Sequence, residues 1–262
     1  MNLTNNTLTI INVFKKFHLP IPNWHKYSGE FISFINSIGV FYLYLLVGIF
    51  LIFFLHYLTV GPKKFTEGGK KIFFYGFLAR FFHWICAFFF SLLVITGLMI
   101  IFAKSFGGSE IIRLARSIHL YCAYGFILFV IPLFLIWVKD MFPASYDIQW
   151  IFMFGGYLSK EERPVPAGKF NFGQKIWFWL STIGGAVMFY TGYFLQRFSA
   201  NQEQLVFYLK IHLILALFIV AFFITHLYMS LFAVKGSLKS MLTGFKSQKE
   251  VSFLHSKMHF DL

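Results

Sequence analysis

The stretch IHLILALFIVAFFITHLY, from Ile211 to Tyr228, decides how this sequence is interpreted. It approaches the roughly 20 apolar residues that a helix needs to cross a lipid bilayer. It contains no Asp, Glu, Lys or Arg, but it carries His212 and His226, fourteen positions apart. An ionisable side chain inside hydrocarbon is costly and therefore indicates a function. Two such side chains in one apolar run require an explanation.

The composition places the whole chain in a membrane. Of its 262 residues, 58% are hydrophobic and 13% are charged, with a mean hydropathy of +0.69. Soluble proteins have about 25% charged residues. The net charge of +13 would suit nucleic acid, but the basic residues cluster at the ends of apolar segments and form no stripe, so we expect no nucleic-acid binding. Cys86 and Cys122 lie in apolar runs without a CxxC spacing, which is typical of packing residues.

Five apolar segments reach the length of a transmembrane helix, so the predicted fold is an all-α integral membrane protein with five such helices. The predicted spans are Ile38–Thr59, Gly76–Ala103, Ser117–Val138, Gly173–Leu195 and Val206–Val234. Between the third and fourth spans, Lys139–Lys175 is the longest polar segment, and we expect it to be a loop.

The distribution of Lys and Arg predicts how the chain is oriented. Segments 63–80, 139–175 and 235–257 fall on one side of the membrane and together hold 15 of the 23 basic residues, against 8 on the other side. Because basic residues concentrate on the cytoplasmic side, this orientation puts the N-terminus in the periplasm and the C-terminus in the cytoplasm.

Alternating spans distribute four histidines over two depths. His83 lies near the cytoplasmic start of the second span, and His226 near the cytoplasmic end of the fifth. His119 lies near the outer start of the third span, at the depth of His212. The sequence thus predicts one histidine pair toward each face of the membrane.

The fourteen-residue spacing indicates what the pairs bind. At 3.6 residues per turn it returns the helix to within about 40° of its starting direction, and at 1.5 Å per residue it separates the two rings by roughly 21 Å. One helix can therefore give an axial imidazole to each of two stacked b-type haems, while two other helices complete the pairs. Two imidazoles leave no open position on the iron, which suits electron transfer. We therefore predict two haems b, held by His83 with His226 and by His119 with His212.

Three further residues follow from this arrangement. Gly97 lies fourteen residues after His83, at the depth of the outer haem, where a missing side chain would give the macrocycle room. Arg80 and Arg116 each precede a predicted ligand by three residues, which places them on the same helix face. There each arginine could pair with haem propionates.

The four paired histidines, and the other histidines of the chain, could also have roles that involve no haem. A membrane histidine can be a hydrogen-bonded structural residue or part of a proton path, although pairing by depth favours ligands. His56 has no histidine partner at its depth, and we expect it to be interfacial. His255 and His259 lie in a polar tail, where we expect them to be solvated.

Several stretches closely resemble the membrane cytochrome b (gamma) subunit of respiratory formate dehydrogenase. They are RFFHW (Arg80–Trp84), SIHLYCAYG (Ser117–Gly125), FNFGQKIWFW (Phe170–Trp179) and the long segment Ile211–Gly244. The resemblance covers about residues 76–250 and implies a four-helix diheme bundle in a bacterial inner membrane. By motif, His83 and His226 would bind the cytoplasmic haem, and His119 and His212 the periplasmic one.

The resemblance also implies a quinone site and partner subunits. The family binds quinone with an Asn-x-Gly-Gln stretch, here Asn171, Gly173 and Gln174, although a polar cluster at a helix start is often only a cap. Electrons would come from an iron–sulfur (beta) subunit, fed by a molybdenum or tungsten catalytic (alpha) subunit that oxidises formate. This chain would pass them to menaquinone or ubiquinone.

The expected organisation follows. Residues 1–37 are a periplasmic leader, 38–59 an extra transmembrane helix, 76–235 the four-helix diheme core and 236–262 a cytoplasmic tail. Two alternatives remain open. The cytochrome b of a nickel–iron hydrogenase has comparable helices and histidines, and a haem-free transporter or scaffold could use the histidines to relay protons.

Overall fold

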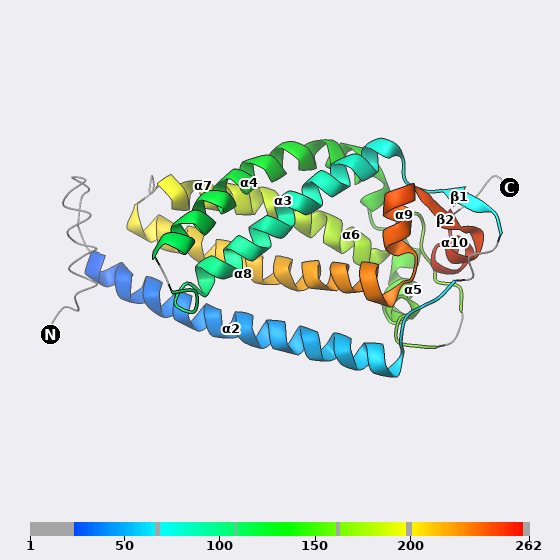
Figure 1. Cartoon of the computed structure of the whole chain (residues 1–262), viewed down its shortest axis with the longest axis horizontal. Coiled ribbons are helices and arrows are strands. Elements are labelled where there is room, and N and C mark those ends of the chain that lie inside the picture. The colour runs from blue at the N-terminus through cyan, green and yellow to red at the C-terminus, as the bar shows by residue number, and fades with distance from the viewer. Residues whose placement is uncertain (1–23, 66–68, 108, 161–162, 198–200, 259–262) are drawn as a thin grey trace.

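The computed structural model describes residues 24–65, 69–107, 109–160, 163–197 and 201–258 (Figure 1). Four of its helical segments are long and apolar enough to cross a membrane: Gly29–Thr59, Phe77–Ile101, Glu110–Met141 and Gln202–Ala233. They overlap four of the five predicted spans and confirm a helical, multi-pass membrane protein. The first of them belongs to a helix that begins at Trp24, inside the segment predicted as a leader, whose residues 1–23 lie outside the described part.

The described elements are mostly helices. The long ones are α2 (Trp24–Thr59), α3 (Phe77–Ile101), α4 (Ser109–Trp137) and α8 (Gln202–Tyr228). The others are β1 (Lys71–Phe73), η1 (Val138–Met141), α5 (Tyr146–Phe152), η2 (Phe154–Gly156), α6 (Phe172–Trp179), η3 (Leu180–Gly184), α7 (Gly185–Arg197), η4 (Met229–Ala233), α9 (Ser237–Thr243), β2 (Phe245–Ser247) and α10 (Gln248–Leu254).

The predicted span Gly173–Leu195 is helical but is not one continuous α-helix. It corresponds to α6 and α7, separated by the π-helical turn η3, so no single piece has the length of the four spans above. Gly185 follows this turn, and a Cβ there would lie 2.9 Å from Cε1 of Phe126 in α4. The absence of a side chain allows α7 to approach α4 closely.

The long helices lie side by side, and α2, α4 and α8 run in one direction while α3 runs in the opposite one (Figure 1). α3 begins, and α4 and α8 end, where the small sheet β1–β2 lies, which we call the sheet end. We call the opposite end, where α3 ends and α8 begins, the far end. α2 packs along α8, to which the buried Tyr42 hydroxyl donates a hydrogen bond at the Leu213 carbonyl (2.8 Å).

The interior and the surface both suit a bilayer. The main core joins α3, α4, α6 and α8 through buried aromatic residues such as Phe90, Phe126, Phe178 and Phe223. Outward-facing side chains of the long helices are also apolar; Phe50 of α2 is 67% exposed. Because lipid is as apolar as these side chains, such a surface is stable only in a membrane.

The C-terminal segment folds back onto the bundle. β2 pairs antiparallel with β1, with Ile72 opposite Lys246, and α9 and α10 flank the sheet. His255 is only 2% exposed, and its Nδ1 is 2.8 Å from the Gly168 carbonyl oxygen. The expectation that His255 is solvated is therefore wrong, because the β1–β2 pairing holds the tail against the loop that follows α5. His259 lies outside the described residues.

The predicted loop Lys139–Lys175 also has more structure than expected. It contains η1, α5 and η2, and α6 begins within it. Lys175 of α6 forms a buried ion pair with Asp147 of α5, with 2.7 Å between Nζ and Oδ2. This segment is part of the folded sheet end.

Candidate functional site

The structure brings the four predicted histidines together as two pairs. His83 of α3 and His226 of α8 lie at the sheet end, with ring centres 6.3 Å apart and ring planes at 56°. His119 of α4 and His212 of α8 lie at the far end, with centres 6.5 Å apart and planes at 62°. These are the pairs that the depth argument predicted.

The ring separation fits two imidazoles on opposite sides of one metal ion. A metal–imidazole bond is about 2 Å long and the ring centre lies about 1 Å behind the nitrogen, so two opposed rings have centres about 6 Å apart. Within the described residues, no three His, Cys, Asp or Glu side chains gather to hold a metal without help. Two imidazoles alone suit haem iron, whose remaining ligands come from the porphyrin.

At the far end, each imidazole is bound by a threonine. Thr96 Oγ1 lies 2.9 Å from His119 Nδ1, and Thr191 Oγ1 lies 2.8 Å from His212 Nδ1. Each hydroxyl also donates its one proton to a main-chain carbonyl, at Leu92 for Thr96 and at Val187 for Thr191. The hydroxyl oxygen is then left to accept from the ring Nδ1–H, which leaves the Nε2 lone pair free to bind iron.

A glycine follows each of these threonines and contacts the same ring. A Cβ on Gly97 would lie 3.4 Å from Cε1 of His119, and a Cβ on Gly192 would lie 3.3 Å from Cε1 of His212. Gly97 therefore has the predicted depth, but its nearest neighbour is the imidazole. The dipeptides Thr96-Gly97 and Thr191-Gly192 each form a small cradle for one ring. The repeated Thr-Gly pair is a signal that sequence reasoning missed.

At the sheet end, the rings are held by aromatic side chains. Trp177 of α6 stacks on His226, with centres 5.5 Å apart and planes at 21°. Trp84 and Trp137 contact His83 at centre distances of 5.3 and 6.2 Å. His83 Nδ1 is buried without a hydrogen-bond partner among the described residues. Such an orphaned nitrogen is expected where a polar group completes the site in the working protein.

A cavity of about 360 Å³ opens beside this pair. Its lining includes His83 and His226 together with the predicted quinone residues Asn171, Gly173 and Gln174. Its wall is mostly apolar and aromatic, with few polar groups, which is typical of a site for an organic molecule. The structure thus brings the predicted quinone residues and the sheet-end histidines to one cavity.

Asn171 and Gln174 also cap helix α6. Asn171 Oδ1 accepts from Gln174 N (2.9 Å), and Gln174 Oε1 accepts from Asn171 N (3.0 Å), a reciprocal capping box. Both amide oxygens are therefore engaged, and Asn171 Nδ2 also donates to the Tyr157 hydroxyl at 3.5 Å. The Gln174 NH₂ group and the second N–H of Asn171 are the donors that remain for a ligand. A Cβ on Gly173 would lie 3.1 Å from the ring of Trp150, so the absence of a side chain lets this tryptophan pack against the start of α6. The residues that cap α6 therefore also line the cavity.

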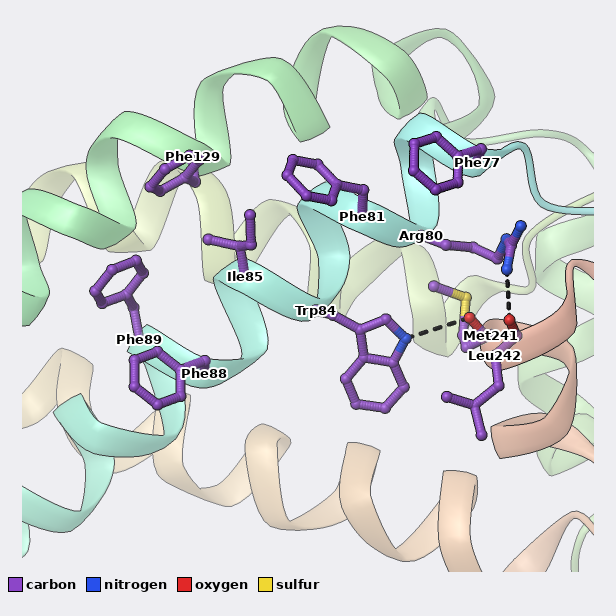
Figure 2. Close-up of a pocket in the computed structure, with 10 residues that line it drawn as sticks. All are labelled: Phe77, Arg80, Phe81, Trp84, Ile85, Phe88, Phe89, Phe129, Met241 and Leu242. Carbon is purple, nitrogen blue, oxygen red and sulfur yellow. Dashed lines mark hydrogen bonds between the residues drawn. The ribbon is translucent and has the colours of Figure 1, made fainter.

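Arg80 lines a separate groove instead of this cavity. Its Nη1 donates to the Leu242 carbonyl of α9, and it lines an apolar groove of about 600 Å³ with Phe77, Phe81 and Trp84 (Figure 2). Trp84 likewise donates from Nε1 to the Met241 carbonyl at 3.3 Å. Arg80 thus ties α3 to α9 and is not among the residues that line the cavity, although its buried Nε has no partner among the described residues.

The remaining predicted residues have clear positions. Arg116 is exposed on α4, three residues before His119, near the far end. His56 of α2 is engaged at both ring nitrogens, with Nδ1 2.6 Å from the Tyr228 hydroxyl and Nε2 2.8 Å from the Tyr157 carbonyl oxygen. His56 therefore joins α2 to the bundle and has no nitrogen left for a metal.

Comparison with known proteins places the chain among membrane cytochromes. Residues 74–244 match the family described as prokaryotic cytochrome b561. The cytochrome b556(Fdn) subunit of nitrate-inducible formate dehydrogenase from Escherichia coli (strain K12) is 29% identical over 199 residues, which cover 71% of this chain and 89% of the relative. The formate dehydrogenase cytochrome b556 subunit of Haemophilus influenzae is 27% identical over 176 residues, covering 63% and 73%.

Proposed function

Because the chain belongs to the prokaryotic cytochrome b561 family, whose members are membrane cytochromes that bind haem b, we propose that it is a diheme electron-transfer subunit that passes electrons to quinone. The two imidazole pairs carry this proposal. Their ring centres are 6.3 and 6.5 Å apart, and α8 contributes one ring to each. A proton relay needs no such matched pairs, whereas two b-type haems do.

The residues of the chain have distinct parts in this function. Haem b, when bound, supplies a one-electron carrier at each pair. His83, His119, His212 and His226 would hold the iron, and two imidazoles per iron would suit electron transfer rather than binding of a substrate at the metal. Arg116 remains a candidate for a propionate at the far end, whereas the contacts of Arg80 favour a role in binding α9.

We further propose that α6, η3 and α7 together form a fifth crossing. From Phe172 to Arg197 they are as long as α3 and continue from the sheet end to the far end (Figure 1). With this crossing, the sheet end lies on the side that holds most basic residues, which would be the cytoplasm. The N-terminus would be periplasmic, and electrons would enter at the far end.

The proposed quinone site is the part of the sheet-end cavity that Asn171 and Gln174 line, next to the part that a haem between His83 and His226 would fill. Amide donors of Asn171 and Gln174 can bind a quinone carbonyl without adding a charge. His226 lines the same cavity, so the carrier that it holds would be adjacent to the ring. Either menaquinone or ubiquinone suits this chemistry, and proton uptake from the sheet end would make the reduction electrogenic.

Two relatives are subunits of formate dehydrogenase, and we propose an equivalent complex here. The donor would be an iron–sulfur (beta) subunit, itself fed by a molybdenum or tungsten (alpha) subunit on the periplasmic side. The chain would then oxidise no formate itself. Co-purification of the intact complex identifies the donor: a nickel–iron subunit in place of the molybdenum or tungsten one would make this a hydrogenase cytochrome.

A reduced-minus-oxidised optical spectrum tests the class directly. The purified full-length chain should show b-type bands and bind two haems per chain by pyridine haemochrome assay. Addition of a short-chain quinone should return the reduced spectrum to the oxidised one. A chain without b-type bands would be a haem-free transporter or scaffold, and the proposal would be wrong.

A further inference from the structure

A buried ion pair borders the sheet-end cavity, apart from all the residues discussed above as ligands. Lys246 of β2 and Glu250 of α10 are bonded through Nζ and Oε1, and each side chain is only 5% exposed. Lys246 is one of the residues that line the cavity. Both residues follow position 244, where the family match ends.

Stability alone is a poor explanation for this pair. Removing two charges from water costs several kcal/mol per ion, and a buried pair often stabilises a fold no more than apolar residues would. The pair also lies outside the long apolar helices, in the small β2–α10 segment. Its burial against a cavity therefore indicates a role in what the cavity does.

The neighbours of the pair connect it to the cavity wall. Burial and the charge of Glu250 raise the pKa of both Tyr75 and Tyr157, that of Tyr157 to about 12, and both tyrosines line the cavity. Burial and the charge of Lys246 lower the pKa of His255 to about 3. The tyrosines and this histidine therefore stay neutral, which leaves Lys246 and Glu250 as the charged groups of the cluster.

The other side of the pair approaches the protein surface. A Cβ on Gly236 would lie 3.5 Å from Oε2 of Glu250, and Gly236 is exposed. Lys246 therefore borders the cavity while Glu250 lies beside an exposed glycine. The two charged groups therefore lie between the cavity and an exposed residue.

We propose that Lys246 donates protons to a quinone bound in this cavity and that Glu250 passes protons to Lys246 from water. This inference rests on the proposed function. Quinone takes up two electrons, supplied by the electron-transfer chain of that function, and two protons, and becomes a hydroquinone. In each proton transfer an Nζ–H bond of Lys246 breaks as an O–H bond forms on the reduced quinone oxygen. The neutral amine then regains a proton from water through the Glu250 carboxylate.

The chain contains a matched control. Lys175 of α6 and Asp147 of α5 form a second buried ion pair, with side chains 5% and 4% exposed. Neither residue is among those that line the cavity. The two pairs are equal in charge and burial and differ in access to the bound molecule.

Lys246→Arg tests the proposal. Arginine keeps the positive charge and the ion pair, but it does not release a proton at any working pH. Full-length protein in lipid nanodiscs is reduced with dithionite, freed of excess reductant, and mixed in a stopped-flow device with a short-chain naphthoquinone. We expect reoxidation at least about tenfold slower than in wild type, because lost general-acid catalysis typically costs more than that. Haem content and naphthoquinone affinity should not change, and Lys175→Arg should match wild type.

The outcomes distinguish failure of the proton relay, the transfer from Glu250 through Lys246 to quinone, from failure of the proposed function on which it rests. Wild-type protein that naphthoquinone does not reoxidise would overturn the proposed function. Normal wild-type reoxidation with an equally fast Lys246→Arg would overturn the relay alone and leave the pair as a structural one. If Lys246→Arg loses its haem, the Glu250→Gln variant tests the proposal instead. Reoxidation of Glu250→Gln should be slower than that of wild type and show a larger solvent deuterium isotope effect, and Glu250→Asp should restore the rate. A wild-type rate in Glu250→Gln would overturn the proton transfer through Lys246 and Glu250.

Discussion

The two histidine pairs have nearly the same ring separation, 6.3 Å at the sheet end and 6.5 Å at the far end, but their surroundings differ. At the far end, threonine hydroxyls bind both Nδ1 atoms, and glycines give both rings room. At the sheet end, tryptophans pack against both rings, one Nδ1 is unpartnered among the described residues, and a cavity adjoins them. The two pairs therefore share the separation that two imidazoles on one iron would need, and they differ in the side chains around the rings.

The difference has a chemical consequence. An imidazole whose second nitrogen donates a hydrogen bond is a more basic ligand and is fixed in orientation. The far-end rings are thus held in one tautomer before any ligand binds. The sheet-end rings are held by contacts with tryptophan side chains, and polar residues such as Asn171 and Gln174 line the cavity beside them. Under the proposed function, the far end would carry electrons only, while the sheet end would also admit a second molecule.

The largest expected effect is the separate loss of one haem from each histidine pair. His212→Ala should remove the far-end haem and His226→Ala the sheet-end haem, each lowering the content from two haems to one per chain. Optical spectra during redox titration measure which component is lost. His56→Ala is the control and should keep both haems, since both ring nitrogens of His56 bind Tyr228 and Tyr157. Loss of the same component in His119→Ala and His226→Ala would refute the pairing.

A second prediction separates the cap of α6 from the proposed quinone site. Gln174→Glu keeps an oxygen that can accept from Asn171 N, because Glu also completes a capping box, but it removes the amide donor. Gln174→Leu removes both the acceptor oxygen and the amide donor. If the donor binds quinone, both variants keep two haems and are reoxidised by quinone about tenfold more slowly, the loss expected when one hydrogen bond of about 1.4 kcal/mol disappears.

Stopped-flow reoxidation by a short-chain quinone measures this effect. A Gln174→Glu variant with a wild-type rate, beside a slow or unstable Gln174→Leu, would leave only the cap. The same would follow if the double variant Asn171→Leu, Gln174→Leu kept both haems and reoxidised normally. Either result would place quinone elsewhere.

A third prediction sharpens the contrast between the rings. Thr96→Val and Thr191→Val remove a hydrogen bond from a far-end imidazole and make it a less basic ligand. A less basic ligand stabilises ferric iron less, so the midpoint potential of the far-end haem should rise. A hydrogen bond of about 1 kcal/mol corresponds to about 40 mV for one electron. Potentiometric titration should show this rise while the sheet-end component stays unchanged.

The conservative variants are the control for this effect. Thr96→Ser and Thr191→Ser keep the hydroxyl and should restore the wild-type potential. A rise in the sheet-end component, or no rise at all in the valine variants, would show that the Thr–His contacts do not distinguish the two sites.

The smallest expected effect concerns the attachment of α2. Tyr42→Phe loses the hydrogen bond to the Leu213 carbonyl beside His212, which should cost about 1 kcal/mol. The midpoint of thermal unfolding, followed by circular dichroism, should fall by about 2–4 °C. Both haems should remain with unchanged potentials. Tyr228→Phe, which removes the corresponding contact with His56 at the sheet end, should behave alike, and loss of either haem would show that α2 belongs to the haem sites.

Sequence alone determined the features that depend on local periodicity. The apolar lengths predicted four spans that the described helices overlap, and the alternation of spans predicted which histidines meet. Helix geometry alone predicted the positions of His212 and His226 on α8, because a fourteen-residue spacing sets both their separation along the helix and the direction in which each side chain points. Helix geometry also predicted the depth of Gly97, but it did not predict that the nearest side chain to Gly97 would be the His119 imidazole.

Tertiary structure decided what depends on residues far apart in the chain. Thr96 and His119 belong to different helices, and no pattern within α3 specifies that the hydroxyl lies 2.9 Å from that ring. The pairing of β1 with β2 joins segments about 170 residues apart, buries His255 and brings Lys246 to the cavity. Periodicity in a sequence describes one helix at a time, whereas these contacts arise from the packing of several elements, which depends on the shapes of all the side chains between them.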